Sequence, residues 1–372
     1  MDFSIPETSA ERRREGAGAV HGTVPGPTPA ARRRWVAQVS ANGATASRIP
    51  IALGGHGRDA RATGSLLSGL AAAVPDPTAA LAVAANGLLV TESLWRLGDQ
   101  RRLPAIITGE AIGAIDLTEA DGGAHPTGVT AHRTGNGWEL TGSKRWVVNA
   151  GIADHFLLTA AGDDGSRTAF VIDARSPGIL TEEVAGPGAP WIAPVRLDRV
   201  QVHDDAVLGT TGAALTELVP VLAALDRSLM LTVWLGALQD LAEQTRVLAL
   251  ADGSRFGRPA GRSQAARFGL ADLISHLDLF SGLVQRALWQ FDARPEALRA
   301  DGAAARLYLS LHIDTMLAAA GEVAGPLPGH RLLHVLAAAP LLRVASGPQI
   351  TRPVLAAAMT GLGGSTILEE TR

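Results

Sequence analysis

The chain has no cysteine, one lysine and one tyrosine among its 372 residues. Without cysteine it has no disulfides, no thiol nucleophile and no zinc or iron–sulfur centre that cysteine holds. The ten histidines show no spacing typical of a metal site. The motifs of serine hydrolases, P-loop NTPases and HExxH zinc peptidases are also missing. These absences exclude most hydrolytic and thiol chemistry.

The chain also lacks a large excess of positive or negative charge. Asp and Glu number 36, Lys and Arg number 33, and the formal net charge is −3. This balance creates no basic field for nucleic acid or an anionic membrane. No uninterrupted apolar run reaches the length of a membrane span. The basic cluster Arg12–Arg14 is not followed by the apolar core of a secretory signal. We therefore expect a cytoplasmic protein without a nucleic-acid partner or membrane insertion.

The pattern along the chain predicts an α+β fold in four parts. Residues 1–30 are rich in Ser, Glu, Arg, Gly and Pro, which predicts a flexible arm. Residues 31–104 carry apolar side chains at helical spacing, and residues 213–372 predict a bundle of long helices whose beginning Pro220 interrupts. Between them, residues 105–212 alternate short apolar segments with turn residues, which predicts a β-barrel or sandwich. Its expected strands are 129–133, 138–140, 156–159, 168–172 and 195–202.

One stretch of the β-region predicts a slot for a planar cofactor. The apolar segment Ile115–Glu119 ends in a Thr-Glu turn, and a glycine-rich loop, Asp121–Ala124, follows it. After a hairpin, the segment Lys144–Ala150 presents a tryptophan and an asparagine. Backbone amides of such a loop can line one side of a flat ligand, and an aromatic ring can line the other.

The order of these motifs resembles the acyl-CoA dehydrogenase superfamily, from about Gly54 to the C-terminus. The resemblance implies an N-terminal helical domain, a middle β-domain, a C-terminal helix bundle and FAD as the cofactor. The motifs that carry it are Gly54-Gly55, Leu97–Gln100, Gly109-Glu110, Leu117–Glu119, Gly142–Lys144, Trp146, Asn149–Asp154, Gly178, Val202, Leu208-Gly209, Leu225–Arg227, Arg255–Gly257, Gln264 and Gly363-Gly364.

The resemblance also implies roles for single residues. Thr118 stands where the family's threonine hydrogen-bonds the flavin pyrimidine edge, with Leu117 offering backbone contacts, and Trp146 stands beside the isoalloxazine. Phe256 and Gln264 would complete the flavin site of a neighbouring subunit, so a homodimer or homotetramer is expected, or a heteromer. The cofactor-binding residues implied in this way are Ile115, Leu117, Thr118, Ala124, Trp146, Val148, Arg255, Phe256, Gln264, Gly363 and Gly364.

Three of these positions depart from the family pattern. Val148 replaces a threonine whose hydroxyl reaches flavin N5, and valine cannot donate that hydrogen bond. Ala124 replaces a serine that touches the pyrophosphate. Gly253 replaces an arginine, for which Arg255 is the expected substitute. Each lost hydrogen bond weakens flavin binding by about 1 kcal/mol.

The catalytic base is the open question of the sequence. The glutamate that most family members carry beyond the last glycine turn is not found after Gly363-Gly364. A minority of the family has its carboxylate directly before an arginine of a helix, where this chain has Asp226 before Arg227. Asp226 is therefore the candidate base. The alternative is that Asp226 forms an ion pair with Arg227 and has no catalytic role.

The reaction implied by the resemblance is the α,β-dehydrogenation of an acyl thioester. The acyl group is carried by coenzyme A or a carrier protein, and an electron-transfer flavoprotein or oxygen accepts the electrons. Two alternatives stay open, because the usual base and the N5 contact are missing. One is a flavin-dependent monooxygenase of the same fold. The other is a non-catalytic subunit that completes the site of a heteromeric partner.

Overall fold

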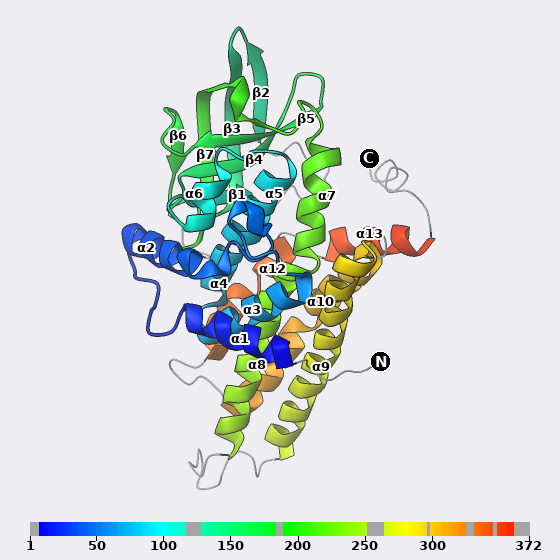
Figure 1. The fold of residues 1–372 in the computed structure, drawn as a ribbon. Helices are drawn as coiled ribbons and strands as arrows, with labels where there is room; N and C mark the ends of the chain where they lie inside the picture. Colours follow the sequence, from blue (N-terminus) through cyan, green and yellow to red (C-terminus); the bar gives the residue numbers. More distant parts are fainter. Residues whose placement is uncertain are drawn as a thin grey trace. The chain divides into compact units, whose positions relative to one another are not determined.

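The computed structural model describes residues 7–116, 128–183, 189–250, 264–295, 298–324, 331–344 and 348–360. Two compact units divide the chain (Figure 1). The first comprises residues 1–21, 60–80 and 227–372. The second comprises residues 22–59 and 81–226. Each unit is built from separate stretches of sequence, whereas the sequence predicted consecutive domains.

The first unit is a helix bundle. Its three long helices, α8, α9 and α10, run side by side (Figure 1). Each carries a buried apolar stripe, as the helical periodicity predicted. The helices of this unit are α1 (Glu7–Ala19), α3 (Ala60–Ala73), α8 (Leu229–Leu250), α9 (Gln264–Ala293), α10 (Leu298–Ala324), α11 (Arg331–Ala338), α12 (Leu341–Val344) and α13 (Pro348–Thr360).

Helix α1 corrects the expected flexible arm over residues 1–30. Glycines explain its close packing on α3. A Cβ atom on Gly16 would lie 1.8 Å from the carbonyl oxygen of Leu66, and one on Gly69 would lie 1.9 Å from that of Arg13. The two backbones therefore cross where neither helix has a side chain. Sequence composition did not reveal this contact, because it joins segments far apart in the chain.

The second unit contains the sheet and shorter helices. Helix α4 (Pro77–Ala84) ends in this unit and continues into the π-helical turn η3 (Ala85–Val90). Pro220 lies inside α7 without breaking it, and the chain instead turns at Arg227 and Ser228. The other helical elements here are α2 (Pro29–Val39), η1 (Ser40–Ala44), η2 (Ile51–Leu53), α5 (Thr91–Arg96), α6 (Leu103–Thr108), η4 (Asp204–Ala206) and α7 (Ala214–Asp226).

The strands form one curved sheet in the order β6-β7-β3-β1-β4-β5-β8, with β2 paired to β3 and β4. All five strands expected from the sequence are present. The strands are β1 (Gly113–Asp116), β2 (Val129–Thr134), β3 (Gly137–Val148), β4 (His155–Ala161), β5 (Arg167–Asp173), β6 (Ile179–Thr181), β7 (Ile192–His203) and β8 (Val207–Leu208). Its inner face packs an apolar core in which Trp138 meets Phe170 edge to face, with ring centroids 5.7 Å apart.

The sheet has an interruption that positions the candidate site. Strands β1 and β2 both lie between β3 and β4, one after the other. Strand β1 ends at Asp116, and β2 begins at Val129. Among the described residues, the interval between β1 and β2 is therefore flanked by Lys144–Trp146 of β3 and Leu158–Ala160 of β4.

Two helical segments are long and apolar enough to cross a membrane by length and composition. They span Pro77–Arg96 and Ala214–Leu250, with 89% and 67% of their most apolar windows buried in the fold. Core helices of globular proteins pass the same test. The sequence reading had found no apolar run of this length, because isolated polar residues interrupt both segments.

Candidate functional site

The alternation of side chains along each strand determines which residues lie on which face of the sheet. Ala114 of β1, Val147 of β3 and Leu158 of β4 belong to the apolar core on the inner face of the sheet. Successive side chains of a strand point to opposite faces. Ile115 and Val148 therefore lie on the outer face, where they are direct partners in the β1–β3 ladder. Two of the residues predicted to contact the cofactor are thus neighbours.

A second row of side chains flanks the end of β1 on this outer face. Ile115 is also the ladder partner of Leu157 in β4, so one apolar row crosses three strands. Trp146 lies two residues before Val148, and Thr159 lies two residues after Leu157. Trp146 on β3 and Thr159 on β4 therefore lie just beyond the apolar row, on either side of the point where β1 ends. Trp146 is half-buried, and Thr159 is 7% exposed.

A β-bulge directs Trp146 to this face. The register of β3 against β7 shifts between Lys144 and Val147, so that Arg145 and Trp146 lie opposite the single residue Pro194. Proline has no N–H to donate to a ladder and is tolerated at such a bulge. Bulges change the direction in which a side chain points and are enriched next to active sites. The tryptophan predicted from the motif is therefore placed by a local irregularity of its strand.

Helix α7 covers part of the outer face and encloses a small pocket. Apolar side chains from α7 face β1 and β4 across it. The Oγ1 atom of Thr159 is buried, and no described residue forms a hydrogen bond with it. The pocket is thus apolar with a free hydroxyl, and a ligand group there would satisfy that hydroxyl. Its lining residues are Ile115, Asp116, Leu157, Leu158, Thr159, Leu218, Val219 and Leu222.

Two buried asparagines hold the start of β1. Asn149, in the left-handed region with φ 66°, donates from Nδ2 to the carbonyl oxygens of Ala82 (2.9 Å) and Gly113 (3.3 Å). Asn86, in the π-helical turn, accepts from the Gly113 N–H at 2.9 Å. A Cβ atom on Gly113 would lie 2.5 Å from Cγ1 of Val90, so this position requires glycine. Both backbone groups of Gly113 are thereby fixed.

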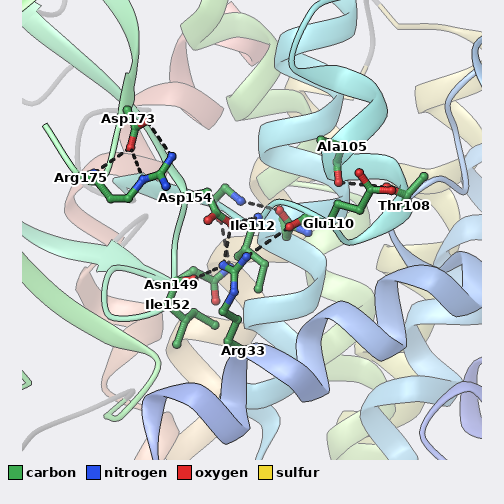
Figure 2. A network of polar contacts seen from close by, with 12 residues as sticks. Arg33, Ala105, Thr108, Glu110, Ile112, Asn149, Ile152, Asp154, Asp173 and Arg175 are labelled. Atoms are coloured by element: carbon green, nitrogen blue, oxygen red, sulfur yellow. Dashed lines mark hydrogen bonds and ion pairs between the residues drawn. The ribbon is translucent and has the colours of Figure 1, made fainter.

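A polar network secures the turn that follows β3 (Figure 2). Arg33 of α2 donates to the Asp154 carboxylate at 2.6 Å and to the carbonyl oxygen of Ile152 at 2.9 Å. It also donates to the carbonyl oxygen of Glu110 at 3.2 Å, and the Ile112 N–H donates to Asp154 at 2.8 Å. The segment before β1 and the segment after β3 are therefore held together at the start of β1.

Next to this network, His155 begins β4. Burial, followed by the positive charge of Arg102, lowers the pKa of His155 below its ordinary value, although nearby carboxylates oppose the shift. His155 is therefore neutral at physiological pH. It adds no charge at the start of β1, where it pairs with Gly113.

The predicted site residues are described only in part. Leu117, Thr118, Ala124, Arg255, Phe256, Gly363 and Gly364 lie outside the described residues. Of the others, Ile115, Trp146 and Val148 share one face of the sheet. Gln264 is the exposed first residue of α9, in the other unit.

Asp226 is the half-buried last residue of α7. Leu218 and Leu222 of the same helix line the pocket, and Asp226 follows Leu222 by four residues. Residues four apart lie on one side of a helix, one above the other. Asp226 therefore continues the stripe of α7 that faces the pocket.

Several supporting residues were not found from the sequence. Asn86, Arg33 and Thr159 come from segments that carry no motif of their own. The π-helical turn around Asn86 gave no sequence signal, although the hydroxyls of Thr91 and Ser93 bond to carbonyl oxygens of its Gly87 and Leu89. Thr159 was included in an expected strand, but only the ladder register places it beside the slot.

Comparison with known proteins shows what the chain resembles in sequence and in fold. Residues 114–200 match the family model of the acyl-CoA dehydrogenase middle domain. A benzylmalonyl-CoA dehydrogenase of Aromatoleum aromaticum is 29% identical over 231 residues. That alignment covers 57% of this chain and 59% of the relative, so the likeness in sequence spans little more than half of either protein.

Solved structures match nearly the whole chain in fold. The prolyl acyl carrier protein oxidase AnaB superposes with a TM-score of 0.83 at 23% identity and covers 95% of this chain and 99% of its own. PigA, solved with FAD and proline, gives 0.84 at 22% identity and covers 97% and 100%. Residues 114–200 therefore resemble the middle domain of acyl-CoA dehydrogenases, and the chain shares the fold of these solved structures.

Proposed function

We propose that the chain is an FAD-dependent oxidoreductase that removes hydrogen from the α and β carbons of an acyl thioester. The observation that carries the proposal is the outer-face arrangement at the end of β1. There, Trp146 and Thr159 flank an apolar row formed by Val148, Ile115 and Leu157. This arrangement occurs in the segment that matches the middle domain of acyl-CoA dehydrogenases.

The residues present fit a flavin. A planar ring system requires an apolar wall, and the row of three aliphatic side chains supplies one. Trp146 offers an aromatic face beside that wall. The buried Thr159 hydroxyl has no partner among the described residues, so it can bond to a polar group of a ligand. Bound FAD would supply hydride acceptance at its N5 atom.

Asp226 is the proposed base for the α-proton. Its carboxylate would accept the proton from the α carbon of the thioester, because an ionised carboxylate is a competent base for a proton acidified by a neighbouring carbonyl. The pocket-facing stripe of α7 supports this role, since Leu222 lies one turn before Asp226. Leu218 and Leu222 would keep water away from the acyl chain, which strengthens the electrostatic interactions of the site.

The carrier and the partners are part of the same proposal. Relatives are named for coenzyme A thioesters, and AnaB is named for an acyl carrier protein, so both carriers are candidates. We propose an electron-transfer flavoprotein or oxygen as the acceptor. We further propose a cytoplasmic homodimer or homotetramer in which Gln264, with Phe256, Arg255 and the Gly363-Gly364 turn, completes a neighbouring flavin site.

Reduction of the bound flavin under anaerobic conditions tests the function. The purified protein is expected to be yellow, and its visible flavin absorbance is expected to fall when an acyl-CoA or an acyl carrier protein thioester is added. A colourless protein that gains no absorbance with added FAD would refute flavin binding. A yellow protein that no thioester bleaches, but that consumes oxygen with a flavin reductase, would favour the monooxygenase alternative.

A further inference from the structure

The only lysine of the chain, Lys144, lies on the inner face of the sheet. Its Nζ atom is 3.3 Å from Oδ2 of Asp116, and the two side chains are 1% and 4% exposed. Lys and Arg together number 33, and all of them except Lys144 are arginine. An arginine at position 144 would bring a planar guanidinium with five donors to satisfy, whereas an ammonium is compact. The compact ammonium of lysine therefore suits this interior position.

The ion pair spans the interruption of the sheet. Asp116 is the last residue of β1, and its ladder partner on β3 is Val147. Its carboxylate reaches back to Lys144, on the far side of the bulge that contains Trp146. Lys144 faces inward with its ladder partner Val195, a core residue. The pair thus joins β1 to β3 from the inside, where the bulge displaces Trp146 to the outside.

Stability alone gives little reason for such a pair. Transfer of two charges from water into a barrel interior costs free energy that their attraction offsets only with good geometry, and apolar replacements of buried pairs are often as stable. What a buried pair does provide is a fixed distance and direction between two segments. Here the segments are the end of β1 and the strand that carries Trp146.

We propose that Asp116 and Lys144 form a positioning pair that holds Trp146 at a fixed place beside the cofactor slot. The pair fixes the strand segment that carries Trp146 relative to the end of β1, where Ile115 forms part of the apolar row. This inference rests on the proposed flavin function, and it assigns a role to two residues that do not themselves contact the substrate.

The test compares broken, replaced and control pairs. Asp116→Asn and Lys144→Met each break the pair, and the double variant Asp116→Leu/Lys144→Met replaces it with apolar side chains. Glu92→Gln is the control. Glu92 is 0% exposed and pairs with Arg48 at 2.6 Å in the same unit, away from the strands of the slot. For each protein, the measurements are the FAD dissociation constant per folded molecule, the urea midpoint and hydrogen exchange of residues 144–148 without cofactor.

The expected results separate positioning from stability. Both single variants bind FAD at least tenfold more weakly, and exchange over residues 144–148 accelerates at least tenfold. The double variant regains the urea midpoint of the wild type but not its FAD affinity. The control loses stability and keeps its FAD affinity. If the double variant regains both properties, or if the single variants bind FAD within twofold of the wild type, the pair has no positioning role.

Failure of the flavin function would be seen separately. If the wild type binds no FAD, the proposed function is refuted, and hydrogen exchange still decides the role of the pair. In that case, exchange over residues 144–148 that is no faster in Asp116→Asn than in Glu92→Gln overturns the inference.

Discussion

Two tryptophans of the same strand make it possible to test the cofactor slot and the apolar core independently. Trp146 and Trp138 both belong to β3, but they face opposite sides of the sheet. Trp138 is 8% exposed and packs in the barrel core against Phe170. Trp146 is half-buried on the outer face, where the bulge places it. Substitution of each by alanine should therefore affect different properties.

The magnitudes follow from these surroundings. Trp138→Ala removes a core ring and leaves a cavity, which costs about 3–5 kcal/mol of unfolding free energy. Trp146→Ala removes a ring that is only partly buried without cofactor, at a cost of about 1–2 kcal/mol. With FAD bound, loss of the aromatic wall removes about 2–3 kcal/mol of binding, a factor of about 30–150 in the dissociation constant.

Urea unfolding of the cofactor-free protein and titration with FAD measure the two effects. Trp146→Ala is expected to fold and to bind FAD weakly, whereas Trp138→Ala is expected to unfold at much lower urea and to keep its affinity in the fraction that is folded. If Trp146→Ala retains the affinity of the wild type, Trp146 is a packing residue and the slot is assigned to the wrong face.

Three further predictions follow from single positions. Asp226→Asn should abolish thioester-dependent flavin reduction in single-turnover experiments and leave the flavin spectrum unchanged; reduction at the wild-type rate would remove Asp226 from the mechanism. Because burial lowers the pKa of folded His155, the unfolded chain binds its proton more readily, so wild-type stability should fall as pH drops below about 6.5. His155→Gln should reduce that fall in urea midpoints between about pH 7.5 and pH 5.5, and an unchanged slope would contradict the assignment. Gly236→Ala should cost about 1–3 kcal/mol, because its Cβ would lie 2.1 Å from the carbonyl oxygen of Ser68, whereas Gly282→Ala has open space and should cost nothing in thermal unfolding.

The sequence predicted the middle of the fold well, because local patterns determine it. Turn signals bound the strands around Trp138 and Phe170, and the bounds expected for the second, 168–172, lie within one residue of those observed at either end. The first was expected over 138–140 and continues to Val148, because its bulges interrupt the apolar pattern that marks a strand. The motif Lys144–Ala150 also singled out Trp146, whose contact with a cofactor stays a prediction. These features depend on neighbours in the chain, which the sequence displays.

What could not be predicted depends on contacts between distant segments. The fixed start of β1 requires Asn86 and Asn149 to meet at Gly113. The arrangement of α1 on α3 depends on the coincidence of Gly16 and Gly69 with opposing carbonyl groups. A single sequence gives no register between such segments, so their pairing was found only in the structure. The same applies to Lys144 and Asp116, whose motifs were read separately.

The single lysine also allows local opening of the folded sheet to be measured by chemical labelling. Apart from the α-amino group, the Lys144 ammonium is the only primary amine in the chain, and it is 1% exposed. An amine-reactive reagent can therefore reach it only after the sheet opens locally. Once the α-amino group has reacted, the rate at which a second label is added, read from the mass of the intact protein, would give the frequency of that opening without any engineered probe.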